Sequence, residues 1–298
     1  MSWPSSPPTS PLPSNNYDAP GDPPAGAREE LLLLRARVDL LSSALSTVIG
    51  NGDPTLLPGR LLRVRRWNTA MAATEIGLLA ATKSFLMEVV ASGGSGGSLP
   101  SSVGSTNNQA GGSGGGAGGY VKAWVPEVPA NVTSVTLAVG AAAVSVLDTK
   151  VNGNPTTLQL YTVAGLQIEL KALGGDGGQI QFVGDAATIS LASIGGEGGN
   201  VSITGGSVLQ LSGGKGKAGY AAMNLGPRAA LAGRGADGPF GVGGYGAVGN
   251  ASVGSQWGDG GSASGYGAGG GGAAQRLACP PCLGGTSSGG FAVMWEFC

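Results

Sequence analysis

Residues 84–98 read SFLMEVVASGGSGGS, an apolar run that passes directly into a run of glycine and serine. Short apolar runs bounded by turn-forming residues are typical of buried strands, so residues 84–91 predict a strand. The same succession of strand-like run and glycine cluster returns many times towards the C-terminus. We therefore expect a mostly β chain whose short strands are separated by glycine-rich segments.

Six runs between residues 134 and 206 show the same strand pattern, and most end in a glycine cluster or another turn signal: SVTLAVG, TLQLYTV, LQIEL, QIQFVG, TISLASI and VSITGG. Short strands at roughly even spacing are typical of a sandwich, a barrel or a stacked-sheet body. The final run, FAVMWEF, alternates two sets of side chains: Phe291, Val293, Trp295 and Phe297 against Ala292, Met294 and Glu296. We expect this last strand to close the core.

Composition narrows the function classes. Glycine supplies 59 of the 298 residues and proline 18, but 41% of the residues are hydrophobic, which argues against a disordered chain. Charged residues make up 11% and the net charge is −1, so there is no electrostatic reason to expect nucleic-acid or membrane-surface binding. Because no run approaches the roughly 18 apolar residues of a membrane span, and no secretory signal is recognised, we expect neither membrane insertion nor Sec export.

The N-terminal region has two parts. Residues 1–26 are rich in proline, serine and asparagine, and we expect an extended arm that docks on a larger particle, the alternative being an unattached tail. Residues 27–50 carry apolar side chains at alternating spacings of three and four: Leu31, Leu34, Val38, Leu41, Leu45 and Val48. This heptad seam predicts a short coiled coil, and its wide apolar face favours three strands. The alternative is an amphipathic helix buried in a monomer.

We expect residues 51–92 to be a linker with the first strands, and residues 93–298 to be a glycine-rich distal domain. Within RLLRVRRWNTA, at residues 60–70, Leu62 and Val64 share one face of a strand, whereas Arg63, Arg65 and Trp67 share the other. We expect the arginine face to be solvated, the alternative being that it binds phosphate.

Residues 213–273 have a different character, with isolated aromatic residues among very frequent glycines. Glycine can adopt a threefold helix like polyproline II, and such helices can pack side by side because glycine lacks a Cβ. The alternative is a set of flexible loops. Collagen is excluded because glycine does not recur strictly at every third residue.

The order of these features resembles glycine-rich bacteriophage tail-fibre proteins. The resemblance lies in the MSWP start with its proline-rich arm, the short coil, and then SFLMEVVASGGSGG, GGGAGGYVKAWV and VTLAVGA. It continues through GGNVSITGG, GYGAGGGGA and GGFAVMWEF, so it covers nearly the whole chain. More loosely, the glycine-rich blocks are similar to the distal adhesins of T-even-type phages, in which polyglycine helices carry variable loops. AAAVSVLDTKVNGNPTT and LACPPCLGG depart from the pattern.

The resemblance implies a homotrimeric virion component that is made in the host cytoplasm. We also expect no enzymatic activity, because the chain lacks histidine and its acidic residues are unpaired. Its N-terminal part would attach to tail or baseplate proteins, and its distal part would bind a bacterial surface receptor, which could be a pilus, a porin or lipopolysaccharide. The alternative is a structural collar or baseplate component that never touches the host.

Catalytic and metal chemistry have little support in the sequence. The chain contains no histidine, which excludes Ser-His-Asp and Cys-His arrangements. The acidic residues Asp176, Asp185 and Glu197 lie in or beside glycine turns, where carboxylates usually cap backbone amides, so we expect no glycosidase pair. Calcium binding by Asp176, Asp237 or Asp259 lacks the nonapeptide spacing, and we expect neither a metal nor a cofactor.

Three cysteines remain, at Cys279, Cys282 and Cys298. The first two have zinc-knuckle spacing, but a zinc site needs about four ligands, and only one further cysteine exists. Two of the three could form a disulfide in the mature particle, with reduced thiols before release from the cytoplasm.

For recognition, the candidate residues are aromatic and cationic side chains among the glycines: Tyr220, Arg228, Arg234, Phe240, Tyr245, Trp257 and Tyr266. Aromatic rings stack on sugars and fill protein grooves at a low entropy cost. The alternative is that about half of these rings pack between glycine helices as spacers.

Overall fold

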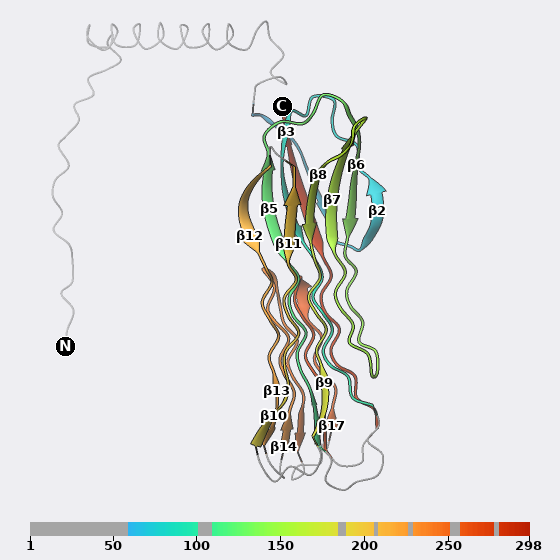
Figure 1. The fold of residues 1–298 in the computed structure, drawn as a ribbon, viewed down its shortest axis with the longest axis vertical. Coiled ribbons are helices and arrows are strands. Elements are labelled where there is room, and N and C mark those ends of the chain that lie inside the picture. Colours follow the sequence, from blue (N-terminus) through green and yellow to red (C-terminus); the bar gives the residue numbers. More distant parts are fainter. Residues whose placement is uncertain are drawn as a thin grey trace, which may run out of the picture. The chain divides into compact units, whose positions relative to one another are not determined.

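The computed structural model describes residues 59–100, 109–183, 189–205, 208–225, 229–250, 257–276 and 280–298. The chain divides into two units, Met1–Leu57 and Pro58–Cys298, and all described residues belong to the second. The predicted arm at residues 1–26 and coiled coil at residues 27–50 therefore lie outside the described residues. Within the described residues there are strands and no helices, which confirms the mostly β prediction (Figure 1).

One end of the second unit is a sandwich of two antiparallel sheets. The first sheet has, in spatial order, β1 (Leu61–Trp67), β20 (Phe291–Phe297), β3 (Ser84–Val90), β5 (Tyr120–Val125) and β12 (Leu209–Gly214). The second sheet has β11 (Val201–Thr204), β8 (Gly165–Ala172), β7 (Thr156–Thr162), β6 (Val132–Val139) and β2 (Met71–Glu75). The predicted strands at residues 84–91, 134–140, 157–163 and 291–297 are thus present as β3, β6, β7 and β20.

Alternate residues of these strands fill the space between the two sheets. Phe85 and Met87 of β3 lie opposite Leu137 of β6 and Leu158 of β7 in one cluster, and all four side chains are completely buried. Burial of each such side chain contributes about 1.5–3 kcal/mol. Strands β1 to β3 belong to the same sheets as β5 to β8, so the chain from Gly59 onward contributes to one folded body.

Beyond the sandwich, the chain runs back and forth as extended glycine-rich segments that lie side by side (Figure 1). We call them the glycine bundle: residues 91–98, 113–119, 151–155, 173–179, 194–200, 215–221, 232–237, 243–247, 259–263, 267–273 and 283–290. Their backbone hydrogen bonds join different segments with a period of three residues. Gly94 N donates to Gly116 O at 2.9 Å, and Gly97 N donates to Ser113 O on the same neighbour, also at 2.9 Å.

Segment 113–119 lies at the centre of the bundle and is completely enclosed. Its first three residues bond to six different segments at 2.9–3.0 Å: Ser113, Gly114 and Gly115 donate to Gln179, Tyr220 and Gly270 and accept from Gly97, Gly196 and Ala236. A Cβ atom on Gly115 would collide with the carbonyl group of Gly94. Glycine is required here because only a bare backbone allows neighbouring segments to approach so closely.

The far end of the bundle carries two small antiparallel sheets that contact each other. One contains β10 (Ile189–Ser193), β13 (Ala222–Leu225), β14 (Ala229–Leu231) and β16 (Val248–Asn250), and the other contains β17 (Trp257–Gly258), β19 (Ala274–Arg276), β4 (Gln109–Gly112) and β9 (Ile180–Val183). Leu99, Ala110, Ala273 and Cys282 form a small core there. The chain connects these strands through residues 101–108, 184–188, 226–228, 251–256 and 277–279, which lie outside the described residues.

A last pair of strands, β15 (Phe240–Val242) and β18 (Ser264–Tyr266), forms a separate two-stranded sheet. Phe240 lies opposite Tyr266 in this pair, and both rings contact Phe291 at the start of β20. The β15–β18 pair therefore packs against the outer side of the first sheet, where the sandwich meets the bundle.

Candidate functional site

Six of the seven predicted recognition residues lie in three separate places along the second unit. Phe240 and Tyr266 lie at the junction between sandwich and bundle, Tyr220, Arg234 and Tyr245 lie on the bundle, and Trp257 lies in the distal sheets. The seventh, Arg228, lies outside the described residues. The structure thus brings together only part of the predicted set.

The junction residues form an aromatic cluster. The Tyr266 ring stacks on Phe291 with centroids 4.8 Å apart, and the Phe240 ring meets Tyr120 edge-on at 5.8 Å. Burial raises the pKa of Tyr120, and its hydrogen bond to the carboxylate of Glu88 raises that pKa further. These contacts show Phe240 and Tyr266 packing the β15–β18 pair against the first sheet, and not between glycine segments, while the Phe240 side chain remains 45% exposed.

Tyr220, Arg234 and Tyr245 lie at the same level on three neighbouring segments of the bundle, and we call them the bundle row. Tyr220 N donates to Arg234 O at 2.9 Å, and Gly235 N donates to Gly244 O at 2.8 Å, which sets the level of Tyr245. The two tyrosines are 58% and 71% exposed. Sequence alone could not reveal this row, because it depends on which glycine segments become neighbours.

Two of the three side chains in the bundle row, those of Arg234 and Tyr245, contact their surroundings. Arg234 forms an ion pair with Asp237 at 2.7 Å, and Asp237 also accepts a hydrogen bond from Gly243 N at 2.9 Å. The Tyr245 ring lies directly against Gly261 of the next segment, where any Cβ atom would collide with it. Side chains that are already positioned lose little conformational entropy when they bind a partner.

A groove of about 360 Å³ lies further along the same segments, and its lining does not include the residues of the bundle row. It runs between residues 214–217 and residues 237–239, which belong to the same two stretches of chain as Tyr220 and Arg234. Tyr120, Lys215, Lys217 and Asp237 line it. The row and the groove together offer aromatic surface, cations and one carboxylate, which is a chemistry suited to binding a polar ligand such as a glycan.

The carboxylates considered for catalysis have structural partners. Asp176 pairs with Lys150, and Glu197 with Lys215, both at 2.9 Å, whereas Asp185 lies outside the described residues. Asp259 accepts a hydrogen bond from Leu283 N at 2.8 Å, the amide-capping role expected of turn acids. Among the described residues, no three His, Cys, Asp or Glu side chains gather closely enough to hold a metal ion.

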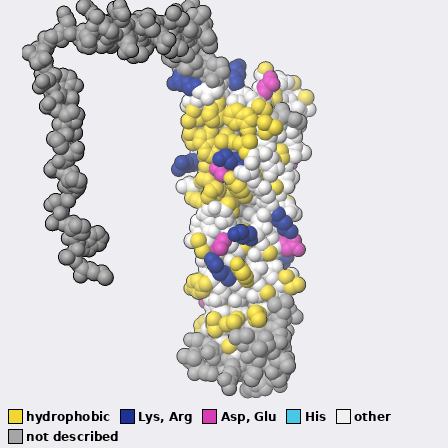
Figure 2. Space-filling view, turned by 90° about the vertical axis from the view of Figure 1, so that its left-hand side faces the viewer, with side chains coloured by type: hydrophobic (Ala, Val, Ile, Leu, Met, Phe, Trp, Pro, Cys, Tyr) yellow, Lys and Arg dark blue, Asp and Glu magenta, His cyan; other side chains and the backbone are white. Residues whose placement is uncertain are grey.

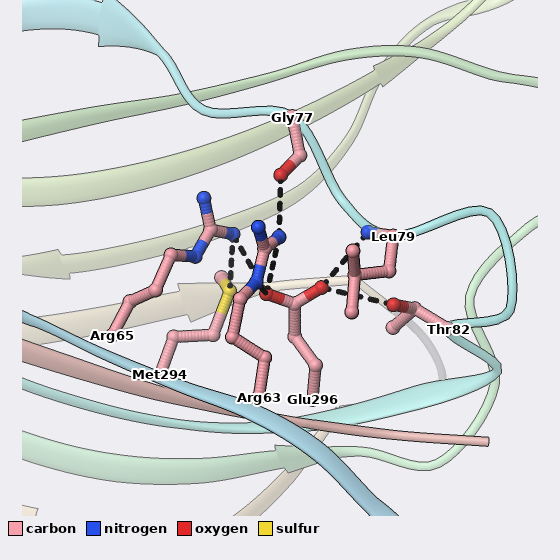
Figure 3. A network of polar contacts seen from close by, with 7 residues as sticks. All are labelled: Arg63, Arg65, Gly77, Leu79, Thr82, Met294 and Glu296. Atoms are coloured by element: carbon pink, nitrogen blue, oxygen red, sulfur yellow. Dashed lines mark hydrogen bonds and ion pairs between the residues drawn. The ribbon is translucent and has the colours of Figure 1, made fainter. Parts of the chain in front are cut away.

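A buried charge network, which sequence reasoning missed, lies at the edge of the first sheet (Figure 3). Glu296 of β20 is completely buried, and its carboxylate pairs with Arg63 at 2.7 Å and with Arg65 at 3.0 Å. It also accepts hydrogen bonds from Leu79 N and from the Thr82 hydroxyl. Burial alone would raise the pKa of Glu296, but these donors together hold that pKa below its ordinary value.

This network corrects the expectation of a solvated arginine face. Arg63 and Arg65 do share one face of β1 with Trp67, but their side chains are turned towards Glu296 and are largely covered. The oxygens of this carboxylate are occupied by donors from β1 and from residues 79–82, so the network joins these parts of the chain to β20. The sequence did contain one signal for this network. Glu296 is the only acidic residue of the final strand, and strand alternation places it on the same face as Ala292 and Met294.

The cysteines are also separated. Cys282 is buried in the core of the distal sheets, whereas Cys298 bonds through its amide to Arg60 O beside the start of β1. These two residues lie at opposite ends of the second unit and cannot pair within one chain. Cys279 lies outside the described residues.

No protein-family model matches this chain, and no curated protein matches its sequence. The described residues also contain no helix that is long and apolar enough to cross a membrane. Any assignment of function therefore depends on the residues and geometry described above.

Proposed function

We propose that this chain is a subunit of a bacteriophage tail fibre that binds a receptor on the bacterial surface. The observation that carries the proposal is the bundle row, a set of exposed tyrosine and arginine side chains positioned by a backbone-packed support. In this proposal, residues 1–26 attach the fibre to tail or baseplate proteins, and residues 27–50 join three copies in a coiled coil. Trp257, which is exposed in the distal sheets, extends the binding surface.

The glycine bundle suits the role of a rigid support. We propose that its segments are polyglycine II helices, since their hydrogen-bond partners repeat every three residues, the number of residues per turn in that helix. A segment whose amides and carbonyls are all bonded to neighbours cannot bend without losing several bonds at once. Side chains on such a support keep their relative positions, which reduces the entropy cost of binding.

The receptor chemistry is inferred from the row and the groove. Tyrosine rings stack on the apolar faces of sugars, and the guanidinium of Arg234 and the ammonium of Lys217 can bond to hydroxyl or acidic groups. Lipopolysaccharide offers both kinds of group, while porins and pili offer grooves that aromatic rings can fill. All three remain receptors to be tested.

Competition with phage adsorption tests the proposal. Purified full-length chain, added in excess to host cells, should block adsorption of the phage whose particle carries it. The double variant Tyr220→Ala and Tyr245→Ala should block poorly, because removal of a binding hot spot costs about 2 kcal/mol, or roughly thirtyfold in Kd. Val163→Ala, at an exposed turn of the sandwich, is the control and should block like the original chain.

Failure of the original chain to block adsorption would contradict receptor binding and would favour a structural collar or baseplate component. Equal blocking by the double variant would place the binding surface elsewhere on the chain. Host mutants that lack the pilus, the porin or lipopolysaccharide would then identify which receptor binds the labelled chain.

A further inference from the structure

The outer face of the first sheet is apolar and aromatic, although it points away from the sandwich core. Strand alternation directs Ala292, Met294 and Glu296 of β20 inward, so the larger side chains of that strand point outward. Register places the outward residues of neighbouring strands beside them. We call this surface the aromatic face: Leu61, Val64, Leu86, Trp124, Leu209, Trp295 and Phe297.

Among the described residues, the chain covers one end of this sheet but not the aromatic face. The β15–β18 pair packs on Phe291 and Tyr120 near the bundle, and Gly267 lies against Val90. No described residue covers the part of the aromatic face that lies towards Gly59 and Cys298. Leu61, Val64 and Leu209 are exposed there. Figure 2 shows the resulting hydrophobic surface over the sandwich, interrupted by only a few charged side chains.

The second sheet provides an internal reference, because its outer face is polar. The residues on that face include Thr136, Gln159, Glu169, Lys171 and Ser202. Gln159 donates to Glu169 at 2.7 Å across neighbouring strands. The same fold therefore has one outer face suited to water and one suited to contact with protein, and an exposed apolar patch of this kind marks an interaction surface.

We propose that the aromatic faces of three copies of this chain pack against one another at the base of the fibre. This inference rests on the proposed trimer and names the surface that completes it. Only eight residues, 51–58, join the predicted coil to Gly59, which is at most about 30 Å of extended chain. If residues 27–50 form the proposed parallel coil, three chains would leave it close to one axis, and this short connection would let three copies of β1 begin near one another.

The chemistry of the aromatic face also favours a second copy over a charged partner. Its charged residues lie in one row across the sheet and are two cations and one anion: Arg66 on β1, Glu88 on β3 and Lys122 on β5. The Lys122 ammonium lies 5.6 Å from the centre of the Trp295 ring, and Trp124 meets Phe297 edge-on at 5.2 Å. A nearly neutral surface rich in tryptophan is typical of the centre of a protein interface.

Photo-cross-linking of the full chain tests this inference. A photoreactive benzoylphenylalanine replaces Val64 on the aromatic face in one variant, and Leu166 on the second sheet in the other. These positions are matched, since their side chains are 42% and 45% exposed, so neither change disturbs the core. Light scattering first measures the mass of each variant. We expect trimers in both, but covalent dimers and trimers only from position 64, with the bonds mapped to the aromatic face of another copy.

The other outcomes overturn the inference in distinguishable ways. A trimer whose position 64 forms no cross-links, or forms them only with residues 1–26, would show that this face is not the contact between copies, while leaving the proposed trimeric fibre intact. A monomer would contradict the trimer itself, and the inference with it. Equal cross-linking from positions 64 and 166 would show contact without preference for either face.

Discussion

The same stretches of chain run through both the sandwich and the glycine bundle, but different groups of atoms fill the interiors of these two regions. Between the two sheets, the interior consists of side chains such as Met87, Leu137 and Leu158. Within the bundle, it consists of amides and carbonyls, with Gly115 bonded through its backbone to segments on two sides. One interior is filled by side chains, and the other exists because side chains are absent.

This difference gives the two regions opposite sensitivities. A side-chain core is weakened when atoms are removed, because the remaining side chains cannot fill the cavity completely. A backbone core is weakened when atoms are added, because the distance between segments is fixed by their hydrogen bonds. Adding one methyl group to a bundle glycine, or truncating one side chain in the sandwich, therefore tests which kind of interior each region has.

The largest effect is expected from Gly115→Ala at the centre of the bundle. The added methyl group would overlap the carbonyls of Gly94 and Ser95, so at least one segment must move and lose hydrogen bonds. We expect the free energy of unfolding, measured by denaturant titration, to fall by more than about 3 kcal/mol, above the usual range for overpacking.

Gly214→Ala is the matched control for this change. Gly214 lies at the end of β12, where an added Cβ meets nothing within 4 Å. Its substitution should alter stability by less than about 1 kcal/mol. If the two alanine variants were equally stable, the close approach of segments 91–98 and 113–119 would be incorrect.

A smaller but still large effect is expected from Leu158→Ala in the sandwich. Leu158 is completely buried between the sheets, and truncation of such a residue costs about 2–5 kcal/mol. Leu166→Ala, on the same sheet but 45% exposed, should cost less than about 1 kcal/mol. Thermal unfolding followed by circular dichroism measures both. Equal melting temperatures for the two variants would contradict the proposed sandwich core.

The sequence predicted individual strands better than their partners. The run at residues 84–91 and the final strand were found because alternation and flanking glycines act locally. The sequence did not show which of the two alternating sets of side chains in the final strand faces the core. In the structure, Ala292, Met294 and Glu296 face inward. The pairing of Glu296 with Arg63 joins residues separated by more than 200 positions, which no local pattern encodes.

The candidate site shows the same limit. Tyr220, Arg234 and Tyr245 were predicted as recognition residues one by one, but their common level depends on three neighbouring glycine segments. The sequence around Phe240 and Tyr266 is as rich in glycine as the sequence around the bundle row, yet these two rings pack on Phe291. Isolated aromatic residues among glycines look alike in sequence, because their exposure is decided by which segments pack together.

The smallest effect is expected from Glu296→Gln, which separates the two regions by their response to acid. The bundle carries ion pairs such as Lys150–Asp176 at its exposed surface, where each contributes little. The sandwich buries Glu296, and loss of its charge at neutral pH should lower the free energy of unfolding by about 1.5–3 kcal/mol.

The pH dependence of this difference follows from the lowered pKa of Glu296. The stabilisation from its carboxylate is fully present above about pH 4.5, the ordinary value of a glutamate, and is lost as the pH falls through the lower folded pKa. The difference in unfolding free energy between the original chain and Glu296→Gln should therefore be constant from pH 7 to about pH 5 and shrink in more acidic solution. Denaturant titrations of both chains between pH 3 and pH 7 measure it, and a difference that grew on acidification would mean that Glu296 is protonated, not ionised, in the folded protein.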